Sequence, residues 1–188
     1  MSLAAEATLS LYGAFRLARF DPQGMRCFNT APSGFWRSFS AAVIVAPFYA
    51  LLLATAYPAL EESPDPVRFA LAEGIAYVVA WVAYPLIMAR LTRQLGRFDR
   101  FIGYIVAYNW AAVLQNALFI PINMLWITGT LQTNIGFLLW VTAFSLILAY
   151  LWFIARTALA VAPMTAASIV GIDIMLNLII STVAHGMR

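Results

Sequence analysis

From residue 101 to residue 155 the chain carries no charged side chain, and this long uncharged stretch constrains the fold more than any other feature. Soluble domains cover their surface with polar groups and are usually about 25% charged. Over the whole chain, 63% of residues are hydrophobic and only 10% are charged, with a mean hydropathy of +0.84. The sequence therefore predicts an all-α, polytopic integral membrane protein.

Five segments are long and apolar enough for membrane-spanning helices, each of which needs about 20 residues. The first two cover residues 38–57 and 69–89. The uncharged stretch is too long for one helix, so the turn-forming residues 128–134 are expected to separate the third span from the fourth. Pro163 ends the fourth span, and the fifth covers about 165–184. The predicted organisation is a cytoplasmic N-terminal segment, 1–37, followed by a five-helix transmembrane domain, 38–188.

All eleven basic residues are arginine, and their positions predict the orientation. In a five-span arrangement, nine of them fall on the side of the N-terminus: Arg16, Arg19, Arg26, Arg37, Arg90, Arg93, Arg97, Arg100 and Arg156. Arg68 and Arg188 fall on the other side, with Glu61, Glu62 and Asp65. Because cytoplasmic loops collect positive charge, the N-terminus is expected inside and the C-terminus outside. The absence of lysine is typical of a GC-rich genome, which indicates a bacterial inner membrane.

The segment before the first span has the pattern of an amphipathic helix. Leu11, Ala14 and Phe15 share one face with Ala18, and Arg16 lies on another side. Such a helix is expected to lie on the cytoplasmic leaflet, or else to pack against the arginine-rich second loop or remain poorly ordered. Anionic lipid headgroups are the expected partners of Arg16, Arg19, Arg90, Arg93, Arg97 and Arg100. These arginines lie next to the membrane, so nucleic acid is not an expected partner.

Three asparagines recur every seven residues in the third span: Asn109, Asn116 and Asn123. Seven residues make nearly two helical turns, so the three amides share one face. They either bond to a neighbouring helix or line a polar cavity, and heptad spacing favours the first because packed seams use it. The expected partners form a second stripe in the fifth span: Asp173, Asn177 and Ser181.

Two acids fall within the predicted spans. Asp173 lies midway along the fifth span, where an unpaired carboxylate is costly. Arg156 is near the same depth across the hairpin, so the sequence favours a buried ion pair between them. The alternative makes Asp173 a proton or cation site. Glu73 lies near the outer end of the second span and is interpreted as hydrated at the interface.

The sequence lacks the residues of a recognisable active site. It has one histidine, His185, and one cysteine, Cys27, which are too few for a histidine-based metal or catalytic site. We therefore expect no enzymatic activity, no cofactor and no metal. The predicted function is that of a non-catalytic membrane component that binds other membrane proteins or itself through helix contacts. The alternative is a small oligomeric transporter or channel subunit whose polar seam carries a proton or cation.

The layout resembles the Yip1-domain family of small polytopic membrane proteins. The resemblance covers residues 35–187 and lies in the topology: a cytoplasmic N-terminus, five closely spaced helices, a polar third span and a short C-terminus. It implies a non-enzymatic protein that binds other membrane proteins or shapes membranes. No functional residue is carried over, because the resemblance includes no shared motif.

Overall fold

The computed structural model describes residues 2–60 and 64–188, and its regular elements are all helices. Glu61 and Glu62, which the charge pattern places at the outer side, lie outside the described residues. In chain order the elements are α1 (Leu3–Ala18), η1 (Pro22–Cys27), α2 (Pro32–Ser38), α3 (Ser40–Ala56), η2 (Tyr57–Ala59), α4 (Pro66–Gln94), η3 (Phe98–Arg100), α5 (Phe101–Ile127), α6 (Asn134–Leu159) and α7 (Pro163–Met187). The α and η elements are α-helices and 3₁₀ helices respectively.

Five helical stretches are long and apolar enough to cross a membrane, which confirms the predicted number. They are Pro32–Ala59, Pro66–Gln94, Phe98–Ile127, Asn134–Leu159 and Pro163–Met187. The turn predicted at 128–134 is also confirmed, because α5 ends at Ile127 and α6 begins at Asn134. The second helix extends beyond the predicted 69–89 at both ends, since backbone hydrogen bonding continues past the purely apolar part of the segment.

Local sequence explains where these helices begin and end. The Asp65 carboxylate accepts a hydrogen bond from the backbone N–H of Arg68 at 2.8 Å, so it caps α4 at the first turn. Thr133 caps α6 in the same way. At the other end of α6, Ala160 adopts a left-handed conformation with φ of 49°, and Pro163 then starts α7.

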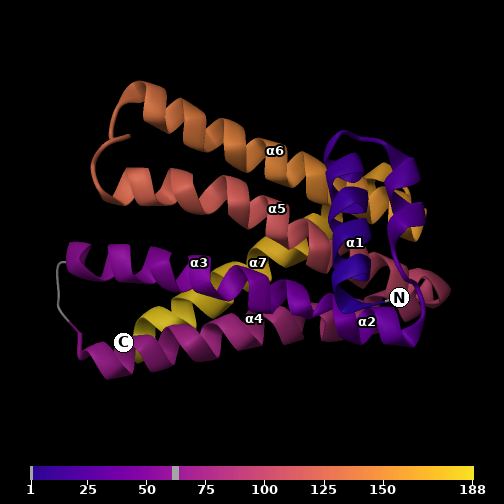
Figure 1. Ribbon diagram of the computed structural model, residues 1–188, viewed down its shortest axis with the longest axis horizontal. Coiled ribbons are helices and arrows are strands. Elements are labelled where there is room, and N and C mark those ends of the chain that lie inside the picture. The colour runs from indigo at the N-terminus through magenta and orange to yellow at the C-terminus, as the bar shows by residue number, and fades with distance from the viewer. Residues whose placement is uncertain (1, 61–63) are drawn as a thin grey trace.

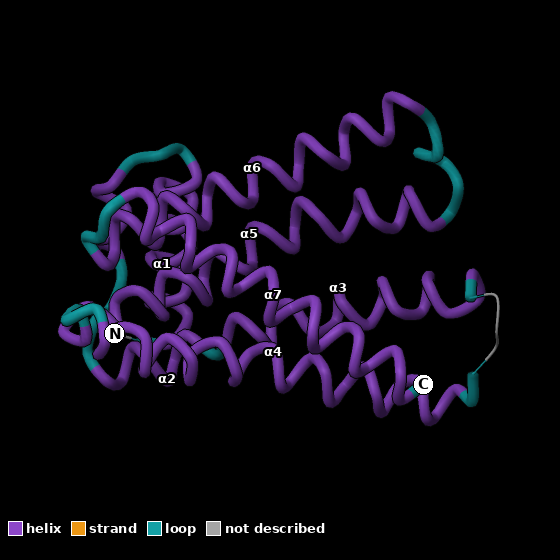
Figure 2. The backbone as a smooth tube through the Cα atoms, turned by 180° about the vertical axis from the view of Figure 1, so that it is seen from behind, coloured by secondary structure: helices purple, strands orange, loops and turns teal. Residues whose placement is uncertain are grey.

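The five long helices surround a common centre (Figure 1). α3 packs against α5, α5 against α6, α6 against α7, and α7 against α4. The two ends of the chain lie at opposite ends of the bundle, as an odd number of spans requires (Figures 1 and 2). α1 lies across the end of the bundle at which α2 is found (Figure 1).

α1 is fixed to the bundle by buried polar contacts. The Glu6 carboxylate is 5% exposed, and it accepts hydrogen bonds from Arg37 at 2.7 Å and from Asn29 at 3.0 Å. The hydrogen bond from Arg37, more than that from Asn29, holds the pKa of Glu6 below its usual value. The Tyr150 hydroxyl of α6 donates to the carbonyl of Ala14 at 2.7 Å. α1 therefore packs against α5 and α6 at this end of the bundle.

The exposed face of α1 differs in part from the predicted apolar face. Ala14 is buried as expected, but Phe15 is 51% exposed. The buried residues of α1 are Glu6, Ser10, Gly13, Ala14 and Leu17. Large apolar side chains of α1, among them Leu3 and Tyr12, face outward instead.

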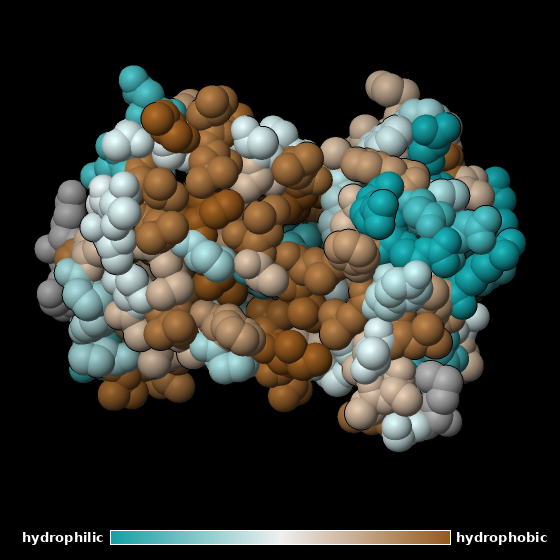
Figure 3. Space-filling model, turned by 45° about the horizontal axis from the view of Figure 1, so that its top comes forward, coloured by the Kyte–Doolittle hydropathy of each residue, from teal (hydrophilic) through white to brown (hydrophobic). Residues whose placement is uncertain are grey.

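The surface is strongly divided by polarity (Figure 3). On the face that Figure 3 shows, hydrophobic side chains cover most of the side of the bundle, and hydrophilic side chains gather at the end where α1 lies. Exposed arginines at this end include Arg19 just after α1, Arg90 and Arg93 of α4, and Arg97 in the connection that follows. The hydrophobic surface runs along the long helices, as expected for a surface that faces lipid.

Candidate functional site

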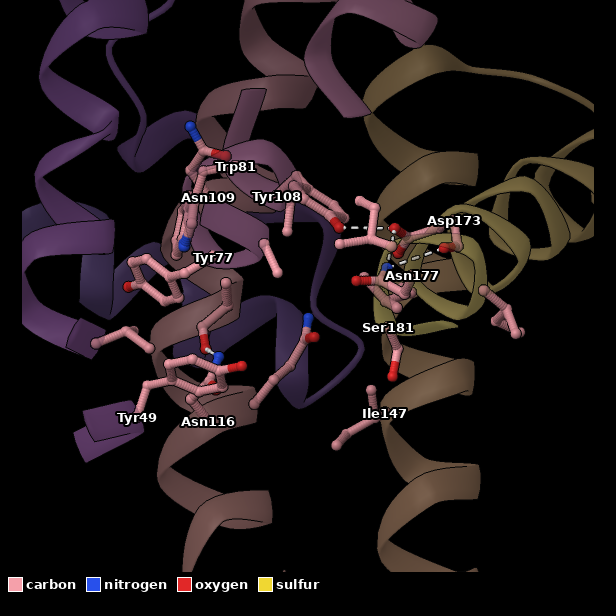
Figure 4. A pocket seen from close by; sticks show the side chains of 18 of the residues that line it. Tyr49, Tyr77, Trp81, Tyr108, Asn109, Asn116, Ile147, Asp173, Asn177 and Ser181 are labelled. Atoms are coloured by element: carbon pink, nitrogen blue, oxygen red, sulfur yellow. Dashed lines mark hydrogen bonds between the residues drawn. The ribbon is translucent and has the colours of Figure 1, made fainter. Parts of the chain in front are cut away.

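A cavity of about 430 Å³ lies at the centre of the bundle, and all five long helices contribute to its wall. This volume is within the range of small-molecule sites. Most of the lining residues come from the middle of each helix, and the stripe on α7 extends towards its C-terminal end. Figure 4 shows the cavity with tyrosines of α3, α4 and α5 facing the polar stripe of α7. The polar side chains on the wall are Tyr49, Glu73, Tyr77, Tyr108, Asn109, Gln115, Asn116, Asp173, Asn177 and Ser181.

Asp173 is the acid at the centre of this wall. It is 4% exposed, and the Tyr108 hydroxyl and the Asn177 amide donate to its Oδ1 at 2.9 Å and 3.0 Å (Figure 4). Within the described part of the chain, no hydrogen bond reaches its Oδ2 and no cationic side chain forms an ion pair with it. The carboxylate is thus held in place by two neutral donors while its charge stays uncompensated.

The ion pair expected between Asp173 and Arg156 does not form in the structure. Arg156 is exposed, and its guanidinium lies 5.2 Å from the ring centroid of Trp152 on the same helix. Arg156 is exposed on α6, whereas Asp173 is buried on α7 and lines the cavity. A rotation about a helix axis is not visible in the spacing of two residues on different helices.

The asparagine stripe also differs from the favoured prediction. The amide groups of Asn116 and Asn123 each donate to a carbonyl of their own helix at 2.8 Å, four residues earlier. Asn109 donates to the Ser38 hydroxyl at 2.9 Å. None of the three bonds to Asp173, so they do not form the expected seam with α7. Asn109 and Asn116 instead line the cavity, and Asn123 does not reach it.

Two buried side-chain atoms of cavity-lining residues have no hydrogen-bond partner among the described residues. They are Oδ1 of Asn109 and Nε2 of Gln115. Leaving a buried polar group unpaired costs about 1–3 kcal/mol. On the wall itself, Oδ2 of Asp173 is an acceptor for which the described residues provide no donor.

Glu73 is buried rather than hydrated at the interface, which corrects the interpretation from sequence. It is 4% exposed, accepts a hydrogen bond from the Tyr49 hydroxyl at 2.9 Å, and forms an ion pair with Arg188. Arg68 donates to the carbonyl of Met187 at 2.7 Å and holds the end of α7 against α4. Glu73 therefore lines the cavity with its charge compensated, in contrast to Asp173.

A cluster of tyrosines supports the Asp173 site. The ring of Tyr84 stacks on Tyr108 with a centroid distance of 4.4 Å, and the hydroxyls of Tyr84 and Tyr104 are hydrogen-bonded to each other. Tyr84 and Tyr104 are each 2% exposed. This packing limits the rotation of Tyr108 and so directs its hydroxyl towards Asp173.

The sequence interpretation missed Tyr49 and Tyr108, which contact the two acids. Tyrosine in membrane helices is common at the two interfaces, where the hydroxyl reaches water. These two lie near the middle of their helices, where a hydroxyl needs a protein partner. Mid-span tyrosines were therefore the available signal, and the acids of other spans were their natural acceptors.

The sequence matches no protein-family model, and no curated protein or solved structure is significantly similar to it. The geometry of the site is therefore what indicates a function for this chain. An uncompensated carboxylate with fixed neutral donors, on the wall of a polar cavity, favours binding of a positive charge. Among the described residues, no group of three or more His, Cys, Asp or Glu side chains is placed to hold a metal ion.

Proposed function

We propose that this multi-pass membrane protein binds a small cation or proton in its central cavity and acts as a transporter or channel subunit. The observation that carries the proposal is Asp173, a buried carboxylate that lines the cavity and has no cationic partner among the described residues. Intramembrane acids with this environment are costly to retain and mark ion or substrate pathways in membrane proteins.

The Yip1-like interaction role is the second candidate. Five closely spaced spans after an N-terminal helix support it. We place it second because the amides of Asn116 and Asn123 donate to carbonyls of their own helix, and Asn116 lines the cavity, whereas a role in packing would have these amides bond to a neighbouring helix. Neither candidate involves a chemical step, and we propose no catalytic role for the site.

The arginines support an orientation with the N-terminus in the cytoplasm of a bacterial cell. Exposed arginines gather at the end of the bundle that carries α1, and α1 presents large apolar side chains beside them. This combination suits contact with an anionic leaflet. Cys27, which is half-buried in the same region, would then react with an impermeant maleimide only after cells are permeabilised.

Asp173→Asn tests the main proposal because it removes the charge and nearly preserves the volume. Binding of sodium and tetramethylammonium to the purified protein is measured by calorimetry, together with the melting temperature. We expect the wild type to bind at least one of these cations and the variant to lose at least tenfold in affinity. Its melting temperature should not fall, because Asn accepts hydrogen bonds as Asp does and removes a buried charge.

Asn123→Leu is the matched control. Asn123 bonds only within its own helix and does not line the cavity, so its loss should leave cation affinity unchanged. If the wild type binds neither cation, and Asp173→Asn lowers the melting temperature, Asp173 serves packing and the second candidate is favoured instead.

A further inference from the structure

A second hollow lies beside the cavity, in the groove between α3 and α4. Its volume is about 570 Å³, and its wall is apolar with many small residues. The small residues are Ala46, Ala50, Ala54, Ala70 and Gly74. A Cβ atom added to Gly74 would meet no other atom within 4 Å, so the groove is open at this point. It lies within two segments that are long and apolar enough to cross the membrane, and lipid chains would therefore surround it.

α3 and α4 are joined mainly through side chains. The rings of Tyr49 and Tyr77 stack with a centroid distance of 5.1 Å. The Tyr49 hydroxyl donates to Glu73, and the Tyr77 hydroxyl donates to the carbonyl of Ala42 at 2.6 Å. The backbones of these two helices pack more closely elsewhere, α3 against α5 and α4 against α7.

Tyr49 and Tyr77 line both hollows. The stacked pair therefore borders both the apolar groove and the polar cavity, and Figure 4 shows the two tyrosines from the side of the polar cavity. Rotation of two tyrosine side chains would join the two spaces without moving a helix. A molecule that extends past this pair would have its apolar part among alanines and its polar part at the carboxylates.

The charges on the polar side favour a cationic group. Glu73 lies next to Tyr49, and Asp173 lies deeper on α7 with no cation of its own among the described residues. Tyr49, Tyr77 and Trp81 line the same space, and aromatic rings attract ammonium groups through their π electrons. An anionic head would meet the uncompensated charge of Asp173 and be repelled.

From these contacts we propose that the ligand is a single-chain amphiphile with a cationic head, which enters from the bilayer between α3 and α4. Its ammonium head binds in the central cavity at Asp173, and its alkyl chain lies in the groove beside Gly74. This inference rests on the proposed function, because it assumes that the cavity binds a cation, and it adds the chemical class of that cation and its route of entry.

The test compares two ammonium probes on the full chain in phosphatidylcholine nanodiscs. Dodecyltrimethylammonium carries the alkyl chain, and tetramethylammonium lacks it. Binding is measured by calorimetry, with protein-free nanodiscs as the baseline for partition into lipid. We expect the dodecyl probe to bind at least tenfold more tightly than tetramethylammonium. We also expect Asp173→Asn to weaken the binding of both probes.

Gly74→Leu isolates the groove, since its side chain would fill space that the alkyl chain needs. We expect Gly74→Leu to lower the affinity for dodecyltrimethylammonium at least tenfold and to leave the affinity for tetramethylammonium unchanged. Unchanged binding of tetramethylammonium would also show that the fold is intact. Gly171→Leu is the matched control, because a Cβ there also meets open space but the residue lines neither hollow. It should change neither affinity.

Two results would overturn parts of the account separately. Equal affinities for the two probes, or no effect of Gly74→Leu, would refute the groove as the site of the alkyl chain and leave the cation site standing. If the wild type binds neither probe above the lipid baseline, the proposal that the ligand carries an ammonium head is refuted. Sodium binding that persists and is lost in Asp173→Asn would then still support the proposed function.

Discussion

Asp173 shows how a single buried carboxylate is kept in a membrane helix. Two neutral donors, Tyr108 and Asn177, hold one of its oxygens. Neutral donors lower the cost of the charged form without cancelling its charge, so the site keeps a preference for cations. A partner arginine would have removed that preference, which is the situation at Glu73.

Gly34 illustrates a residue whose role is purely steric. A Cβ at this position would lie 2.1 Å from the carbonyl oxygen of Asn29 and would force α2 away from the preceding loop. We expect Gly34→Ala to destabilise the protein by about 1–3 kcal/mol through overpacking. Thermal unfolding in detergent measures the effect.

Gly171→Ala is the control for the change from glycine to alanine in a helix. Its Cβ would meet open space, and alanine is favoured over glycine in helices by about 1 kcal/mol. The melting temperature should therefore stay the same or rise. Equal losses of stability in both variants would show that the contact at Gly34 is not the cause.

At the level of single residues, the sequence predicted which polar side chains matter but not what they contact. Asp173, Asn177 and Asn109 were selected because polar groups are costly in a membrane, and all three line the cavity. Their partners depend on the rotation of each helix about its axis. The apolar periodicity is weak in helices whose lipid-facing and core-facing sides are both hydrophobic, and the rotation could not be derived from it.

The contacts that hold α1 depend on pH through Glu6. Glu6 accepts hydrogen bonds from Arg37 and Asn29, and the pKa of this carboxylate is lowered on folding. A carboxylate with a lowered pKa in the folded state stabilises the protein above its unfolded pKa of about 4.3. This contribution disappears as the pH falls through the lower pKa of the folded state.

We therefore expect Glu6→Gln to lower the melting temperature by several degrees near pH 7. The difference between wild type and variant should shrink as the pH falls below about 4.3, because a protonated Glu resembles Gln in shape and charge. Melting curves at a series of pH values measure this. A difference that stays constant down to pH 3 would contradict the role of the Glu6 charge.

The element boundaries were largely predictable, and the packing of α1 was not. Prolines and turn residues such as Pro163 and Gly129 interrupt the apolar segments at the places where the helices end. α1 was expected either on the leaflet, because Leu11, Ala14 and Phe15 share a face, or packed against the arginine-rich second loop or poorly ordered. The structure buries a face that includes Glu6 and Gly13, where the ion pair between the buried Glu6 and the exposed Arg37 and a close approach to η1 hold the helix.

At the level of the whole molecule, five helices enclose a polar centre and present an apolar exterior. The number of spans followed from hydrophobicity, because a helix must be apolar to cross a bilayer. The cavity did not follow, since it results from the way in which α3, α5, α6, α7 and α4 succeed each other around the centre. In this order α3 packs against α5 and not mainly against α4, which follows it in the sequence.

The central claim is that the polar face of α7 borders a cavity that admits water and cations, and cysteine reactivity tests it most directly. In a Cys27→Ser background, Ser181→Cys would line the cavity, whereas Ile179→Cys would face outward at nearly the same depth. Both are treated in liposomes with a water-soluble, positively charged thiol reagent. We predict that Ser181→Cys reacts at least tenfold faster than Ile179→Cys. Equal rates, or no reaction at Ser181→Cys, would contradict the account.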